Sequence, residues 1–149
     1  MFKLHPRLAA DTSQVLKLEL CRVLLMNDRA VPWLILVPER HGVSEQPSVS
    51  EQPGLVEMHH LPPGERALLM EEIALASSAL EALHPTAKLN VGALGNMVPQ
   101  LHVHVIARFP GDRAWPGPIW GTGPVEPYPP EELERTLERL RAEFAESRG

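Results

Sequence analysis

Polar and apolar side chains alternate along residues 100–105, which read Gln-Leu-His-Val-His-Val. A period of two residues is typical of a β-strand with one face on a hydrophobic core and the other face free for another role. The core face would carry Leu101, Val103, Val105 and Ala107. The opposite face would carry Gln100, His102, His104 and Ile106. Because imidazole can be a neutral nucleophile or a cation near pH 7, two histidines on one strand face suit chemistry on an anion.

Residues 96–108, Asn-Met-Val-Pro-Gln-Leu-His-Val-His-Val-Ile-Ala-Arg, resemble the signature strand of the histidine triad (HIT) family of nucleotide hydrolases and transferases. The family signature reads His-φ-His-φ-His-φ-φ, where φ is an apolar residue. His102 and His104 match its second and third histidines, whereas Gln100 occupies the position of the first. The likeness covers roughly residues 15–108, since a strand ending at residues 24–28 and a second strand at 33–38 are similar to the family's nucleotide-binding hairpin.

The resemblance implies a catalytic role for each of the three motif residues. His102 would attack the α-phosphorus of a nucleotide through Nε2, with its Nδ1 proton held by a backbone carbonyl group, and water would cleave the nucleotidyl-histidine intermediate. His104 would bind phosphate oxygens or protonate the leaving group. Gln100 can donate a hydrogen bond, but its amide cannot carry a proton through the reaction or hold a positive charge.

We therefore expect a nucleotide hydrolase or nucleotidyl transferase that acts at the α-phosphate and needs no cofactor or metal ion. Diadenosine polyphosphates, nucleoside phosphoramidates and nucleotide sugars all remain candidate substrates, and adenine is only the family's commonest base. A function of another class is also open. The protein would then be a nucleotide-binding module whose catalysis is weak or absent because Gln100 replaces the first histidine.

Two further groups of residues are candidates for nucleotide binding. Asn27 and Asp28 follow a predicted strand, where short polar side chains usually close a turn. The family has a ribose-contacting Asn or Asp at this strand end, so we expect both roles. The second group lies in a predicted hairpin, where the backbone N–H groups of residues 95–98 could face phosphate, although a plain glycine-rich turn has the same composition. This group comprises Asn90, Asn96, Met97 and Val98.

The remaining patterns predict a single α+β domain over residues 1–149. Apolar residues spaced by three and four predict a long helix from Pro63 to His84 and a C-terminal helix over residues 130–147. Strand patterns cover residues 15–26 as one run, 33–37, 88–92 and 100–108. The resemblance implies a mainly antiparallel sheet of the HIT type, with the first of these helices as a crossover.

Two irregular segments interrupt these elements. Residues 39–54 contain Ser-Glu-Gln-Pro twice and read as a low-complexity surface loop. Residues 109–129 form an arm rich in Pro, Gly and Trp. Trp115 and Trp120 could stack on a base, fill a subunit interface or, as we favour, pack within the protein. Association through this arm is a third possible function.

Composition and charge narrow the class of protein. A net charge of -5 and 44% hydrophobic residues indicate an ordinary soluble domain without a general surface for nucleic acid polymers or anionic membranes. The single cysteine, Cys21, excludes an intramolecular disulfide and a thiolate metal cluster, which fits a reducing cytoplasm. No apolar run approaches the ~18 residues of a membrane span. Because HIT proteins commonly pair, we also expect a homodimer.

Other kinds of chemistry find less support in the sequence. His102 and His104 form a His-x-His pair, but two ligands are too few for a metal site. The sequence indicates no evident third His, Asp or Glu ligand. A serine nucleophile elbow would need Gly-x-Ser-x-Gly, which is absent, and Cys21 lies in a strand predicted to be buried. An inert strand that happens to carry two histidines is the remaining alternative.

Overall fold

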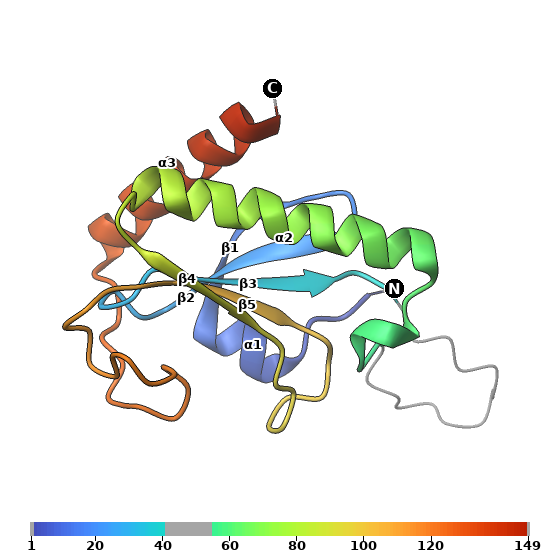
Figure 1. The fold of residues 1–149 in the computed structure, drawn as a ribbon, viewed down its shortest axis with the longest axis horizontal. Helices are drawn as coiled ribbons and strands as arrows, with labels where there is room; N and C mark the ends of the chain where they lie inside the picture. Colours follow the sequence, from blue (N-terminus) through green and yellow to red (C-terminus); the bar gives the residue numbers. More distant parts are fainter. Residues whose placement is uncertain (1, 41–54, 149) are drawn as a thin grey trace.

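The computed structural model describes residues 2–40 and 55–148, so the predicted loop at 39–54 lies almost entirely outside the described residues. Within these residues, five strands form one antiparallel sheet in the order β1-β2-β3-β5-β4 (Figure 1). They are β1 (Thr12–Lys17), β2 (Cys21–Met26), β3 (Trp33–Pro38), β4 (Lys88–Gly92) and β5 (Val103–Arg108). The helices are α1 (Pro6–Asp11), α2 (Pro63–Leu83), α3 (Pro130–Arg148) and the 3-10 turn η1 (Met58–His60). The predicted α+β class is confirmed.

The two long helices cover one face of the sheet. α2 connects β3 to β4 and crosses that face, with α3 beside it (Figure 1). The buried apolar side chains of α2 recur at the predicted spacings and meet the strands; they are Leu69, Ile73, Ala76 and Leu80. Leu137, Leu140 and Phe144 of α3 extend this main core. Because burying one such side chain contributes roughly 1.5–3 kcal/mol, this layer supplies much of the fold's stability.

The prediction of one strand over residues 15–26 is wrong, because the chain folds there into two antiparallel strands. A turn at residues 18–20 joins β1 to β2, and the Leu18 N–H donates to the Cys21 carbonyl oxygen at 2.8 Å. Leu18 and Leu20 are both buried, so the apolar pattern continues through the turn and hides it. Glu72 of α2 accepts hydrogen bonds from the N–H groups of Leu20 at 2.9 Å and Cys21 at 2.7 Å. A carboxylate in the core thus stabilises the turn.

The strand predicted from residue 100 begins three residues later, because it has no strand partner before Val103. The β3 ladder ends with Leu36 opposite Val103, and the β4 ladder ends with Gly92 opposite His104. The predicted alternation of faces is nevertheless confirmed. Ile106 is buried on the side away from the long helices. The residues in the main core are Leu101, Val103, Val105 and Ala107.

The other face of the sheet is also covered. α1 lies against it (Figure 1), and the arm contributes Ile119 and Trp120. A second apolar cluster results; its buried members are Leu8, Leu24, Val31, Trp33, Ile35, Val37, Val98, Ile106 and Ile119. His102 and His104 are therefore each only 7% exposed. The histidines lie inside a partly closed site instead of on an open strand face.

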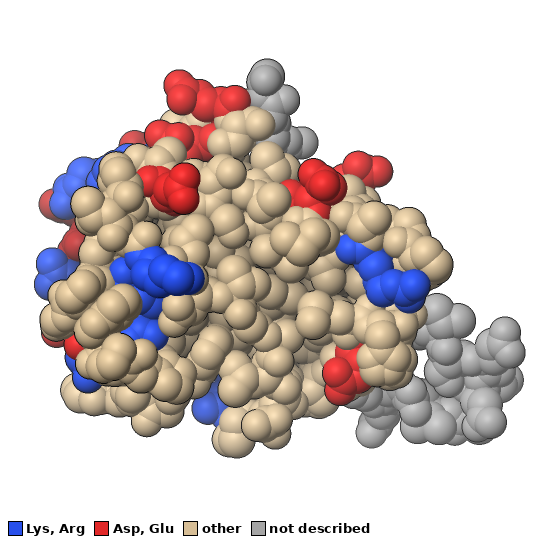
Figure 2. Space-filling view, viewed as in Figure 1, with Lys and Arg blue, Asp and Glu red and all other residues tan. Residues whose placement is uncertain are grey.

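Charged side chains are dispersed over the surface. On the face shown in Figure 2, basic and acidic side chains form small separate groups around a largely uncharged centre. As far as the described residues go, this face shows no broad basic surface of the kind that binds nucleic acid polymers. None of the helices within the described ranges is both long and apolar enough to cross a membrane.

Candidate functional site

His102 and His104 line a cavity of about 390 Å³. His104 is the second residue of β5, and His102 lies immediately before that strand. Their ring centroids are 4.9 Å apart, and the ring planes meet at 68°. The structure thus brings together the two imidazoles that the alternating pattern places on one face.

The position of the proton on neutral His102 follows from its hydrogen bond. Its Nδ1 lies 2.7 Å from the backbone carbonyl oxygen of Gln100. A carbonyl oxygen only accepts, so Nδ1 carries the proton and Nε2 carries the lone pair. Burial lowers the pKa of His102 and the nearby His5 lowers it further, while the hydrogen bond to Gln100 opposes both effects. Near pH 7, His102 is consequently a neutral imidazole with a free Nε2.

His104 has the opposite arrangement. The indole N–H of Trp33, on β3, donates to Nδ1 of His104 at 2.9 Å. Nδ1 must therefore carry the lone pair, and the proton of the neutral ring lies on Nε2. Burial, together with the nearby His102, lowers the pKa of His104 to about 3. The two neighbouring histidines thus differ in which nitrogen is protonated.

Apolar side chains from several elements form the cavity walls. Leu8 comes from α1, Met26 from the end of β2, Ile35 from β3 and Trp120 from the arm. Polar side chains of α1 and β1 lie beside them, namely Arg7, Asp11 and Thr12. A concave site with mainly apolar walls and a few polar groups is typical of small-molecule binding. These apolar walls suit a flat ring system, and the two histidines in the same cavity could contact a polar group attached to that ring.

The loop between β4 and β5 supplies the rest of the lining, residues 94–98. Gly95 has a φ of 72°, a left-handed conformation that glycine adopts without strain. Three residues predicted to bind nucleotide, Asn96, Met97 and Val98, are in this lining. Met97 is 74% exposed, whereas Val98 is buried. The loop therefore brings these three predicted residues to the histidines, as the hairpin pattern suggested.

Gln100 lies next to the site but serves the N-terminal segment. Its side-chain oxygen accepts from the backbone N–H of His5 at 2.8 Å, and its Nε2 donates to the carbonyl oxygen of Lys3 at 2.9 Å. The side chain is buried and is not part of the cavity lining. A direct catalytic role for Gln100 stays a prediction. Its contacts show it fastening the segment that leads into α1.

Comparison with known proteins identifies the family. The family model named HIT domain matches residues 7–111, more than two thirds of the chain. This chain belongs to the HIT family. No curated protein matches it.

Solved structures of other HIT proteins resemble the whole chain. A histidine triad protein from Marinobacter aquaeolei VT8 is 44% identical over 98% of each chain, with a TM-score of 0.85. A histidine triad (HIT) protein from Sinorhizobium meliloti 1021 is 42% identical over 95% of this chain and 96% of its own, with a TM-score of 0.82. One from Bradyrhizobium japonicum is 40% identical over 96% and 98%, with a TM-score of 0.85. The likeness therefore includes the arm and the C-terminal helix of this HIT chain.

Two aromatic residues of this HIT site, Trp33 and Trp120, are not evident as site residues from the sequence. The pattern predicts Trp33 only as part of a strand, and for Trp120 it favours packing within the protein over stacking on a base. Trp120 packs edge-on against His104, with ring centroids 5.4 Å apart, and lines the cavity. The pairing of β3 with β5 indicates the position of Trp33. Ile35 lies opposite His104, and Trp33, two residues earlier on β3, is on the same face of the sheet as both. Nothing in the sequence alone placed Trp120.

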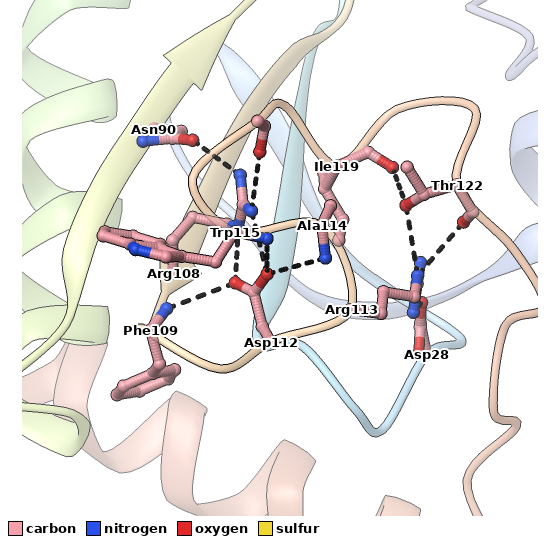
Figure 3. A network of polar contacts seen from close by, with 11 residues as sticks. Asp28, Asn90, Arg108, Phe109, Asp112, Arg113, Ala114, Trp115, Ile119 and Thr122 are labelled. Atoms are coloured by element: carbon pink, nitrogen blue, oxygen red, sulfur yellow. Dashed lines mark hydrogen bonds and ion pairs between the residues drawn. The ribbon is translucent and has the colours of Figure 1, made fainter.

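Asn27, Asp28 and Asn90 are not among the residues that line the cavity. Asn27 accepts a hydrogen bond from the Tyr128 N–H at 2.9 Å through its side-chain oxygen. The buried Asp28 carboxylate forms an ion pair of 2.8 Å with Arg113 (Figure 3). These side chains attach the arm to the end of β2. Their binding of nucleotide stays a prediction. Asp28 closes the predicted turn, because its side-chain oxygen also accepts from the Ala30 N–H at 3.2 Å, whereas the Asn27 side chain contacts the arm.

A buried ion pair anchors the beginning of the arm. Arg108, at the end of β5, pairs with Asp112 at 2.7 Å and also donates to the Asn90 side-chain oxygen at 3.0 Å (Figure 3). Asp112 accepts further hydrogen bonds from the N–H groups of Ala114 and Trp115. The Arg108 guanidinium holds the pKa of Asp112 well below its usual range. Asn90 thus acts within this network, which fixes the part of the chain that leads to Trp120.

The described residues provide no evident metal centre. Within residues 2–40 and 55–148, no group of three or more His, Cys, Asp or Glu side chains is placed to hold a metal ion. Nδ1 of His102 is protonated, and Nδ1 of His104 accepts a hydrogen bond from Trp33. Of the two histidines, only His102 therefore has a ring nitrogen, Nε2, whose lone pair is free to bind a metal ion. A single nitrogen ligand is too few, because zinc sites in proteins use three or four protein ligands.

Proposed function

We propose that the protein is a nucleotide hydrolase or nucleotidyl transferase that acts at an α-phosphate through His102. The observation that carries this proposal is the hydrogen bond from His102 Nδ1 to the Gln100 carbonyl oxygen, which leaves Nε2 unprotonated on a residue that lines the cavity. A neutral imidazole with a free nitrogen is the form required for nucleophilic attack. Membership of the HIT family, whose members act on or bind nucleotides, supports the same reading.

The proposed reaction has two steps at phosphorus. Nε2 of His102 forms a bond to the α-phosphorus, and the bond from phosphorus to the leaving group breaks with its electron pair going to the leaving group. Water, or another acceptor in a transferase, then attacks phosphorus and the P–N bond breaks. Water as acceptor gives a nucleoside monophosphate. The Gln100 carbonyl oxygen keeps the Nδ1 proton in place and stabilises the cationic ring of the intermediate.

The rest of the cavity is assigned to binding. The apolar walls formed by Leu8, Met26, Ile35 and Trp120 would take the base. Backbone N–H groups of residues 95–98 and the Nε2–H group of His104 would face the phosphoryl oxygens, where negative charge grows as the reaction proceeds.

Product analysis tests this proposal. The wild type and His102→Ala would each be incubated with diadenosine tetraphosphate, an adenosine phosphoramidate and a nucleotide sugar. We expect the wild type to release a nucleoside monophosphate and His102→Ala to release none. His60→Ala is the matched control because His60, in η1, is exposed and is not among the residues that line the cavity. Equal turnover by the wild type and His102→Ala would contradict the proposal.

One observation favours a second candidate, a nucleotide-binding module with weak or no catalysis. Gln100 is occupied by the backbone of Lys3 and His5, so it offers no acid or base to the cavity. Calorimetric titration with a non-hydrolysable nucleotide separates the two candidates. An enzyme would lose turnover in His102→Ala while it keeps most of its affinity. A binding module would show affinity in both proteins and turnover in neither.

A further inference from the structure

Trp33 and His104 form a side-chain pair that simple nucleotide binding does not require. Trp33 lies on β3 and His104 on the adjacent β5, and both are more than nine-tenths buried. Their hydrogen bond, from indole Nε1 to imidazole Nδ1, is 2.9 Å long, and their ring centroids are 5.7 Å apart at an angle of 61°. The contact is therefore directional, and it involves one of the two histidines in the cavity.

An indole N–H group can only donate, so this contact dictates the proton on His104. Nδ1 must accept and the proton of the neutral ring must lie on Nε2. A second proton on Nδ1 would point at the Trp33 N–H group and remove the hydrogen bond. Among the described residues, the other aromatic rings packed against His104 are those of His102, on the same segment, and Trp120, from the arm, and the residues opposite it in the sheet are Ile35 and Gly92. None of these neighbours carries a negative charge that would stabilise an imidazolium ion, and the carboxylate in the cavity lining, Asp11, is half exposed and lies 3.9 Å from Arg7.

We propose that Trp33 holds His104 as a neutral hydrogen-bond donor, so that the site favours substrates whose leaving group departs without taking up a proton. This inference rests on the proposed function, since it concerns the group expelled when His102 attacks. His104 stabilises a phosphoryl oxygen through Nε2–H and does not act as the general acid. Trp33 is a positioning residue in this scheme, because it acts through His104.

The leaving-group preference follows from where protons are available. Donation by His104 would require an imidazolium ion with protons on both nitrogens, and the Trp33 hydrogen bond opposes that form. Gln100, on the other side of His102 in the motif, has an amide that cannot transfer a proton. Neither motif residue that flanks His102 therefore protonates the leaving group.

The chemistry of the first step then selects the substrate class. The P–N bond to His102 forms, the bond to the leaving group breaks, and its electron pair leaves with that group. A phosphate oxygen accepts this pair as a stable anion, because the second pKa of a phosphate monoester is about 6. An amine departs only after it is protonated. Water later cleaves the P–N bond, the electron pair returns to Nε2 and a water proton passes to the solvent. The site is thus suited to phosphoanhydrides, such as dinucleoside polyphosphates, over phosphoramidates.

Trp120 offers a matched control for Trp33. It also packs edge-on against His104, but its indole nitrogen is buried without a hydrogen-bond partner among the described residues. Trp33→Phe removes a hydrogen bond to His104 and keeps an aromatic ring. Trp120→Phe keeps an aromatic ring and removes no hydrogen bond to His104. The two variants therefore separate loss of the proton constraint from loss of indole packing.

Nuclear magnetic resonance of histidine labelled with nitrogen-15 tests the proton position without substrate. In the wild type, we expect His104 to show an unprotonated Nδ1 and a protonated Nε2 from about pH 5 to 8, the range in which histidine usually titrates. Trp33→Phe should change this tautomer or allow protonation in that range, and Trp120→Phe should change neither. A wild-type His104 protonated on Nδ1, or unaffected by Trp33→Phe in a folded variant, would overturn the proposal.

Kinetics with two leaving groups on one nucleotide test the preference. We expect wild-type kcat/KM to be at least about 100-fold higher for diadenosine tetraphosphate than for an adenosine phosphoramidate, the usual scale of general acid catalysis. Trp33→Phe should narrow that ratio, whereas Trp120→Phe should change both values by the same factor. An unchanged ratio in Trp33→Phe would overturn the proposal. Absence of turnover with every substrate would reject the leaving-group preference and the proposed function together, while the spectra would still decide the role of Trp33.

Discussion

The side-chain oxygen of Gln100 accepts a hydrogen bond of 2.8 Å from the backbone N–H of His5. The amide nitrogen of the same side chain donates to the carbonyl oxygen of Lys3 at 2.9 Å. Gln100 thereby holds the segment before α1 over the sheet face that carries the two histidines. An amide carries its donor and its acceptor side by side on one carbon atom, whereas the donor and acceptor nitrogens of a neutral imidazole ring point away from each other. The glutamine in the first motif position thus has a structural role in this chain.

Gln100→Ala should loosen the N-terminal segment. Two hydrogen bonds to a buried side chain would be lost, and each contributes about 1 kcal/mol, so we expect the free energy of unfolding to fall by about 1–3 kcal/mol. Urea denaturation measures this loss, and hydrogen exchange should show faster exchange of the His5 amide. Gln14→Ala is the control, since Gln14 is exposed on β1. Similar stability of the two variants would argue against the fastening role.

Gln100→His should change catalysis more than binding. It restores an ionisable group at the first motif position, next to the carbonyl oxygen that accepts from His102. We expect the rate or its pH dependence to change by a larger factor than the dissociation constant for nucleotide, because Gln100 does not line the cavity. Steady-state kinetics over a pH range and calorimetric titration measure the two quantities. Equal changes in both would contradict this expectation.

The sequence predicted the elements well because their apolar periodicities are strong. The stripe on α2 and the alternation from Leu101 to Ala107 both reappear as predicted contacts with the core. The β1–β2 turn was missed because its leucines are buried and it lacks the residues that usually mark turns. Periodicity reports which face of an element is buried, but it does not report a turn made of core residues.

Only the part of the site that has a local sequence pattern was predicted. His102 and His104 share a local pattern, so the motif alone placed them together. Trp33 and Trp120 reach His104 from separate parts of the chain, and only the register of β3 on β5 and the course of the arm bring them there. Contacts between residues far apart in sequence depend on the folded backbone.

Trp120 and Trp115 should differ in their effect on nucleotide affinity. Trp120 lines the cavity, whereas Trp115 lies outside that lining, with its ring 5.9 Å from the guanidinium carbon of Arg108. We expect Trp120→Ala to weaken nucleotide binding by about 1–3 kcal/mol, the usual contribution of a base stacked on an aromatic ring. Trp115→Ala should leave affinity nearly unchanged. Calorimetric titration of both variants checks this, and equal affinities would show that Trp120 only packs against the protein.

A homodimer stays a prediction, and the edge strand β4 is where we would test it. β4 ends the sheet on one side and carries the exposed Val91, followed by the exposed Leu94. An unpaired strand edge with apolar side chains is suited to pairing with a second copy. We expect the wild type to sediment as a dimer and Val91→Glu to shift it toward monomer. Met70→Glu, at an exposed site on α2, is the control. A wild type that sediments only as a monomer would reject the dimer.

The Arg108–Asp112 ion pair should make stability depend on pH. Arg108 is almost fully buried, so Asp112→Asn leaves its charge without a carboxylate partner. We expect a loss of about 3 kcal/mol in the free energy of unfolding near pH 7. Asp11→Asn should have a much smaller effect, because Asp11 is half exposed and lies 3.9 Å from Arg7.

The direction of the pH dependence follows from the lowered pKa of Asp112. Its contribution to stability is complete above the ordinary carboxyl pKa of about 3.8 and is lost as the pH falls from there through the lowered value of the folded protein. Urea denaturation at a series of pH values should therefore show the wild type and Asp112→Asn converging below about pH 4. A difference between them that stays constant down to the lowest pH at which the protein folds would show that the carboxylate does not stabilise Arg108.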